Sequence, residues 1–121
     1  MRCMPSDASQ SERWLYHIRR NIELAQRFIG GLAYEEFRDN DLVFYAVTRC
    51  LEIISEASRR LPREMKERHP HVPWREMAAA GNVYRHDYED VDQRLVCGTV
   101  HDCPPPMLVV VETELHRLAQ S

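Results

Sequence analysis

The sequence lacks several patterns that would place it in a specialised class of protein. Its 121 residues include four cysteines, but no two of them form a C-x-x-C pair, and no histidine spacing completes a zinc site. No apolar run approaches the roughly 20 residues that span a bilayer. Residues 1–11 are polar and lack the apolar core of a secretory signal. We therefore expect a cytoplasmic protein with free cysteines, no membrane association, no metal and no other cofactor.

An excess of positive charge is also missing. The chain has 16 lysines and arginines against 19 acidic residues, for a formal net charge of −3. This balance argues against a protein that coats nucleic acid through its overall charge, although it leaves room for a local basic site. There are no internal repeats and no low-complexity segments. The length fits one domain over residues 1–121 that can bury a working core, and residues 1–11 are expected to be a flexible N-terminal segment.

Helical periodicity dominates the first half of the chain. A first helix is predicted to start at an N-cap, Ser11, and to end at Gly30-Gly31. A short turn over residues 34–37 follows. Asp39, Asn40 or Asp41 can then cap a second long helix. The two apolar stripes are Leu15, Ile18, Ile22, Ala25 and Ile29, and then Val43, Val47, Cys50, Ile54, Ala57 and Leu61.

A connector separates this half from the next predicted helix. Pro62 ends the second helix or opens a short one that ends near His69. His69 and His71 flank Pro70, and we expect both to be exposed to solvent rather than to act as ligands. Trp74 is predicted to open a third helix that continues to about residue 86.

The C-terminal part has weaker signals. Residues 91–100 show a short helical pattern, and Pro104-Pro105-Pro106 is interpreted as a rigid spacer. A last helix is expected from a stripe at Leu108, Val111, Leu115 and Leu118. The chain as a whole predicts an all-α fold, an antiparallel bundle of four to five helices.

The most informative stretch is Gly81-Asn82-Val83-Tyr84-Arg85-His86-Asp87-Tyr88. On a helix, Asn82 and His86 share one face, and Gly81, Arg85 and Tyr88 share another. Histidine titrates near neutrality, arginine can hold a phosphate, and tyrosine offers a hydroxyl that can be modified.

Each residue of this stretch also has an ordinary interpretation. His86 could be a surface residue near a helix C-terminus, Arg85 and Asp87 a solvated charge pair, and Tyr88 a core or interface aromatic. The small residues 78–81 would let another helix or a second subunit approach closely. Periodicity alone does not settle the function.

Several segments in order resemble the HepT-like branch of the HEPN superfamily. The stretch from Gly31 to Phe37 is similar to the family's first interhelical turn, and Leu51 to Ala57 is similar to its second-helix signature. Leu61-Pro62, Pro73-Trp74-Arg75-Glu76 and His86-Asp87-Tyr88 follow with the family's spacing.

The resemblance implies a small helical homodimer from a prokaryotic toxin–antitoxin pair. It implies a metal-independent endoribonuclease in which His86 is catalytic and RNA is the substrate. It also implies a nucleotidyltransferase antitoxin as partner, which can transfer AMP to the motif tyrosine, here Tyr88. Asn82 and Asp87 would be supporting residues of this site.

One residue departs from the family pattern. The motif arginine is usually found five positions before the histidine, where this chain has Gly81. RNA cleavage through the 2′-hydroxyl needs a base for its proton and a cation for the charge that grows on the phosphate. Arg85 lies one turn after Gly81, and its side chain could reach back over the glycine to supply that cation. Alternatively, Gly81 serves close backbone packing, and the protein is a catalytically silent subunit that dimerises and binds a nucleotidyltransferase.

Glu52 and Glu56 share a face of the second predicted helix. They could form a surface ladder with Arg49 and Arg60. They could equally lie near the motif and orient His86 or Arg85.

Overall fold

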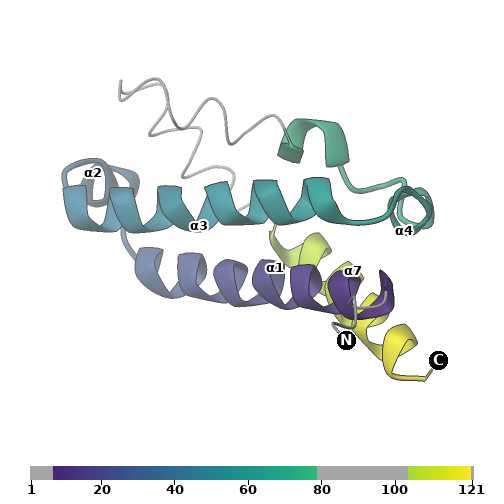
Figure 1. Cartoon of the computed structure of the whole chain (residues 1–121). Coiled ribbons are helices and arrows are strands. Elements are labelled where there is room, and N and C mark those ends of the chain that lie inside the picture. Colours follow the sequence, from purple (N-terminus) through teal and green to yellow (C-terminus); the bar gives the residue numbers. More distant parts are fainter. Residues whose placement is uncertain (1–6, 79–103, 121) are drawn as a thin grey trace, which may run out of the picture.

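The computed structural model describes residues 7–78 and 104–120 of the chain. Every regular element in these two ranges is a helix, which confirms the predicted all-α fold class. A further helical stretch covers residues 74–78, in agreement with the predicted start at Trp74. The long elements are α1 (Asp7–Ile29), α3 (Asp41–Arg60) and α7 (Pro104–Ala119), and the short ones are α2 (Tyr34–Arg38) and α4 (Arg63–Glu67) (Figure 1).

Helix α1 begins earlier than the sequence suggested. It already includes residues 7–11, so Ser11 is not its N-cap but a buried residue inside the helix. The last five residues of the expected flexible segment 1–11 therefore belong to α1. The predicted end is confirmed, because Gly30 has a φ of +53°, which suits a residue without a Cβ.

The turn between the long helices is itself helical. Residues 34–38 form the short helix α2, in which Phe37 is buried. The Glu36 carboxylate accepts a hydrogen bond from the Ala33 N–H at 3.1 Å, which satisfies one free donor at the helix start. Asn40 then caps α3, because its Oδ1 accepts from the Val43 N–H at 3.1 Å.

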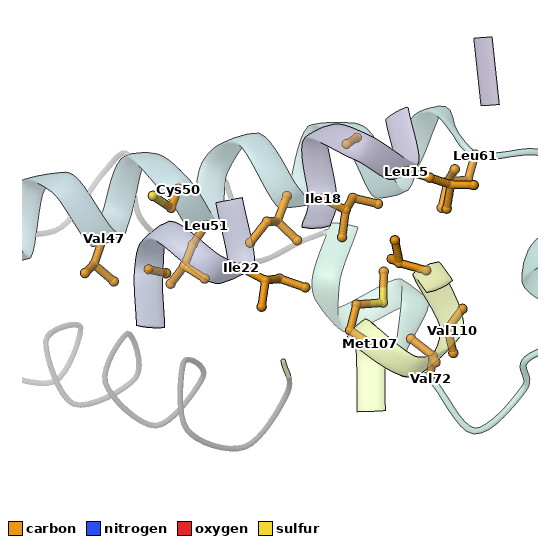
Figure 2. Close-up of a cluster of buried hydrophobic side chains, with 14 of the residues drawn as sticks. Leu15, Ile18, Ile22, Val47, Cys50, Leu51, Leu61, Val72, Met107 and Val110 are labelled. Atoms are coloured by element: carbon orange, nitrogen blue, oxygen red, sulfur yellow. The ribbon is translucent and has the colours of Figure 1, made fainter. Parts of the chain in front are cut away.

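Helices α1 and α3 run antiparallel and form the centre of the fold (Figure 1). All five residues of the α1 stripe are at most 2% exposed. The α3 stripe is buried as well, except for Val43, which is half-buried. In Figure 2, Leu15, Ile18 and Ile22 of α1 lie in one cluster with Val47 and Cys50 of α3, Met107 and Val110 of α7 and Val72 of the connector. Each fully buried leucine or isoleucine stabilises the fold by about 1.5–3 kcal/mol, so this interface accounts for much of the stability.

Helix α7 differs from its prediction in two ways. It starts at Pro104, so the prolines form its first turn instead of a spacer. The first N–H groups of a helix have no partner within it, so proline is tolerated there. Its buried face is also turned relative to the predicted stripe, since Leu108, Leu115 and Leu118 are only half-buried. The fully buried residues are Met107, Val110, Val111 and Glu114.

Candidate functional site

The predicted catalytic and modification residues lie outside the described residues. This applies to the motif residues Gly81, Asn82, Arg85, His86, Asp87 and Tyr88, and to the weak helix expected at 91–100. Their positions stay predictions. The structure does describe Glu52 and Glu56, and it describes the chain as far as Ala78, three positions before Gly81.

The chain just before the motif is fastened to α3 by side chains. The carbonyl of Ala78 accepts a hydrogen bond from Ser55 Oγ at 3.0 Å and another from an Arg59 guanidinium N–H at 2.9 Å. At the other end of the 74–78 stretch, the Trp74 indole N–H donates to the carbonyls of Lys66 and His69. The backbone that leads into the motif therefore has a fixed position on the bundle.

Glu52 and Glu56 take part in ion pairs along α3. Glu52 lies 3.4 Å from Arg49, and Glu56 lies 3.0 Å from Arg60, so the contacts of a surface ladder are present. Glu56 also binds Arg59 at 2.6 Å. Hydrogen bonds from Arg59 and then Arg60 hold the pKa of Glu56 below its ordinary value. Arg59 thus joins the Glu56 carboxylate to the Ala78 carbonyl.

A groove of about 620 Å³ runs beside this ladder, between α1 and α3. Glu52 and Glu56 form part of its α3 wall, together with Arg49 and Ile53. The α1 wall consists of Trp14, His17, Arg20, Asn21 and Leu24. Glu52 and Glu56 therefore line one groove, whose α1 wall was not predicted from the sequence.

A second charged cluster was missed by sequence reasoning. Glu114 on α7 has only 2% of its side chain exposed, and its carboxylate binds the Arg68 guanidinium at 2.6 Å and His69 Nε2 at 2.6 Å. Burial by itself would raise the pKa of Glu114, but hydrogen bonds from Arg68 and His69 outweigh it and leave the pKa below its ordinary value. The cluster joins the connector to α7.

This cluster corrects the expectation for His69. The side chain is 13% exposed and hydrogen-bonded, not free in solvent, whereas His71 is exposed as predicted. The signal was present in the sequence, because Glu114 lies at helical spacing from Val110 and Val111 and so belongs to the buried stripe of α7.

Three further properties of the described residues bear on function. Within 7–78 and 104–120, no three His, Cys, Asp or Glu side chains gather in a way that could hold a metal ion. Cys50 is a buried free thiol, and burial raises its pKa, which makes it a poor nucleophile. None of the helices in those ranges is both long and apolar enough to cross a bilayer.

Comparison with known proteins identifies the family. The model of a family described as "Ribonuclease HepT-like" matches residues 18–114, a range that includes α1 from Ile18 onward, all of α3 and the motif. The "Probable ribonuclease HepT" of Thermococcus cleftensis is 38% identical over 94 residues, which cover 78% of this chain and 86% of that protein.

Other relatives agree with this match. Two Methanocaldococcus jannaschii proteins with the name "Putative RNase" are 37% identical over 86 residues and 36% identical over 99 residues. The first alignment covers 71% of both chains, and the second covers 82% of this chain and 91% of the relative. No solved structure matches the chain with significance. The chain therefore belongs to the HepT-like ribonuclease family, within the HEPN superfamily.

Proposed function

We infer that this protein is the toxin of a prokaryotic toxin–antitoxin pair and acts as a metal-independent endoribonuclease. The observation that carries this proposal is the family match over residues 18–114, because that range contains His86-Asp87-Tyr88 at the family's spacing. The relatives named as ribonucleases support RNA as the substrate class.

In the proposed reaction, the 2′-hydroxyl of RNA attacks the adjacent phosphorus. His86 accepts the hydroxyl proton, and the bond from phosphorus to the 5′-oxygen of the next nucleotide breaks. The 5′-oxygen takes up a proton from water as it leaves, which gives a 2′,3′-cyclic phosphate and a free 5′-hydroxyl, and His86 returns its proton to solvent. Arg85 supplies the cation that stabilises the phosphate oxygens, in place of the arginine that Gly81 replaces. Asn82, Asp87, Glu52 and Glu56 support the site.

The fixed backbone at Ala78 supports this placement of roles. Ser55 and Arg59 hold the chain eight positions before His86, and Arg59 is itself bound by Glu56. A catalytic base needs a defined position, and a fixed backbone at Ala78 would restrict the positions that His86 can occupy. Glu56 would then act as a positioning residue through Arg59, without touching RNA.

We also propose the assembly and the regulation. The toxin forms a homodimer in the cytoplasm, with the small residues 78–81 at the contact. A nucleotidyltransferase antitoxin neutralises it by transferring AMP to Tyr88. The added phosphodiester would bring negative charge and bulk beside His86 and so repel an RNA phosphate.

The decisive experiment is expression of the chain alone in cells, scored for growth arrest and RNA decay, beside His86→Ala. The proposal expects arrest and decay with the wild type and neither with the variant. A wild-type chain that neither arrests growth nor cleaves RNA would favour the silent binding subunit, for which Gly81 is the specific observation. Adenylylation that persists in Tyr88→Phe would contradict the modification site.

A further inference from the structure

Three hollows follow one another along the seam between α1 and α3. The groove of about 620 Å³ beside Glu52 and Glu56 meets a second of about 420 Å³, since Trp14 lines both. The second meets a third of about 440 Å³, since Gln10 and Arg60 line both. Together they form one continuous depression, here called the seam track, from Leu24 to the start of α4. Figure 1 shows the two helices side by side along this length.

The seam track is more positive than the chain as a whole. Its lining includes three glutamates, namely Glu52, Glu56 and Glu64, against five arginines, which are Arg13, Arg20, Arg49, Arg60 and Arg63. The whole chain has a formal net charge of −3. Of these five arginines, Arg49, Arg60 and Arg63 form ion pairs within the described part of the chain, whereas Arg13 and Arg20 form none there. These two cations are about 10 Å apart along α1, and they remain available to an anion.

An aromatic ring lies in the middle of these cations. The guanidiniums of Arg13 and Arg60 lie 5.6 Å and 5.8 Å from the centre of the Trp14 ring, and the His17 ring lies 5.6 Å from it. A cation–π contact holds a guanidinium in place without neutralising it. Trp14 is half-buried, which fixes the ring against the core. Arginines that follow a groove together with a fixed aromatic ring are the combination that binds single-stranded nucleic acid.

The seam track also leads toward the predicted catalytic segment. Glu56 lines the first groove, and Arg59 joins Glu56 to the carbonyl of Ala78. A ligand that follows the track therefore passes the point where the chain leads into the motif. This favours the substrate of that motif over an acidic peptide as the occupant.

We propose that the seam track binds single-stranded RNA, with Arg13 and Arg20 on its phosphates and the Trp14 ring against a base. The proposal rests on the ribonuclease function inferred above and assigns its substrate a binding surface formed by residues of α1, α3 and the start of α4. RNA held there would reach the cleavage site as an extended strand, and a duplex would bind more weakly.

The test measures binding separately from cleavage. A fluorescein-labelled, fully 2′-O-methylated oligoribonucleotide has no free 2′-hydroxyl, so its fluorescence anisotropy reports binding alone. Arg13→Glu/Arg20→Glu should weaken binding at least about tenfold and lower the dependence of log Kd on log salt. Arg27→Glu/Arg117→Glu makes the same charge change at exposed positions outside the three hollows and should retain wild-type affinity. Arg13→Gln/Arg20→Gln should give an intermediate loss, and urea unfolding of each variant verifies the fold.

Each outcome decides one question. Equal weakening by both double glutamate variants, or displacement of the RNA probe by polyglutamate at equal charge concentration, would overturn the seam track as an RNA site. Wild-type kcat/KM on unmodified RNA in Arg13→Glu/Arg20→Glu would overturn it while leaving the ribonuclease function intact. Selective loss of probe binding by that variant, with no cleavage of unmodified RNA by the wild type, would support the track and reject the ribonuclease.

Discussion

Glu56 and Glu114 are each bound by two basic side chains, but their surroundings are opposite. Glu56 is 39% exposed and pairs with Arg59 and Arg60 on its own helix. Glu114 is 2% exposed, and its partners lie 45 and 46 positions earlier in the chain. The Glu56 cluster lies on the surface of one helix, whereas the Glu114 cluster joins two segments that are distant in the sequence.

The difference shows that similar distances do not imply similar stabilisation. Water can replace the partners of an exposed carboxylate, so breaking its ion pairs costs little. A buried carboxylate has no such replacement, and removal of one member leaves the others unsatisfied. The following changes test this contrast between the two clusters.

Glu114→Ala should have the largest effect. It removes the acceptor for Arg68 and His69 and leaves a cavity on the buried face of α7, so we expect a loss of about 3 kcal/mol in the free energy of unfolding. Urea denaturation measures this loss. Glu112→Ala, an exposed residue of the same helix, is the matched control and should change stability by less than about 0.5 kcal/mol. Equal effects of the two substitutions would mean that the buried cluster contributes nothing.

The two clusters should also differ in how much they contribute to the pH dependence of the free energy of unfolding. The folded-state pKa of Glu114 lies below its ordinary value of 4.5, so its contribution is complete above that pH and is lost as pH falls through the folded pKa. The free energy of unfolding should therefore depend less steeply on pH below about 4.5 in Glu114→Gln than in the wild type. Glu56→Gln should change this dependence less than Glu114→Gln does, because solvent screens the ion pairs that lower the pKa of Glu56. If the free energy of unfolding of Glu114→Gln depended on pH as steeply as that of the wild type, the lowered pKa of Glu114 would be contradicted.

Arg59 and Arg60 offer a matched pair within the exposed cluster. Both bind Glu56, but Arg59 also donates to the Ala78 carbonyl. Arg59→Ala should therefore speed amide hydrogen exchange in residues 74–78 by severalfold, and Arg60→Ala should leave that exchange unchanged. Identical exchange rates in the two variants would show that the Ala78 contact does not stabilise the segment.

Glu56→Ala should have the smallest effect on stability. Its ion pairs are exposed and lie within one helix, so we expect a change below about 0.5 kcal/mol in the free energy of unfolding, and less at high salt. Thermal unfolding at low and high salt measures both quantities. A loss as large as that of Glu114→Ala would remove the distinction between the clusters.

Sequence patterns predicted the elements whose cause is local. The stripes of α1 and α3, the stop at Gly30 and a cap within residues 39–41, which the structure assigns to Asn40, each depend on residues within about one helical turn. The start of α7 was missed because prolines can open a helix as well as exclude one. The burial of Glu114 was predictable from its helical spacing to Val110 and Val111, but its partners and the groove were not, because they depend on contacts between segments far apart in the chain. The motif itself was recognised by resemblance, and its geometry stays a prediction.

The buried Glu114 cluster has a consequence for the segment that carries His86. That segment leaves the described structure at Ala78, held by Ser55 and Arg59, and returns at α7, which Glu114 fastens to the connector. In topological terms, the contacts of Glu114 with Arg68 and His69 close the chain between the connector and α7, an interval that contains His86. Glu114→Ala would open this closure at α7 while leaving the contacts of Ala78 with Ser55 and Arg59 in place. A substitution that makes no contact with RNA in the proposed reaction could thus alter one of the two described flanks of the motif.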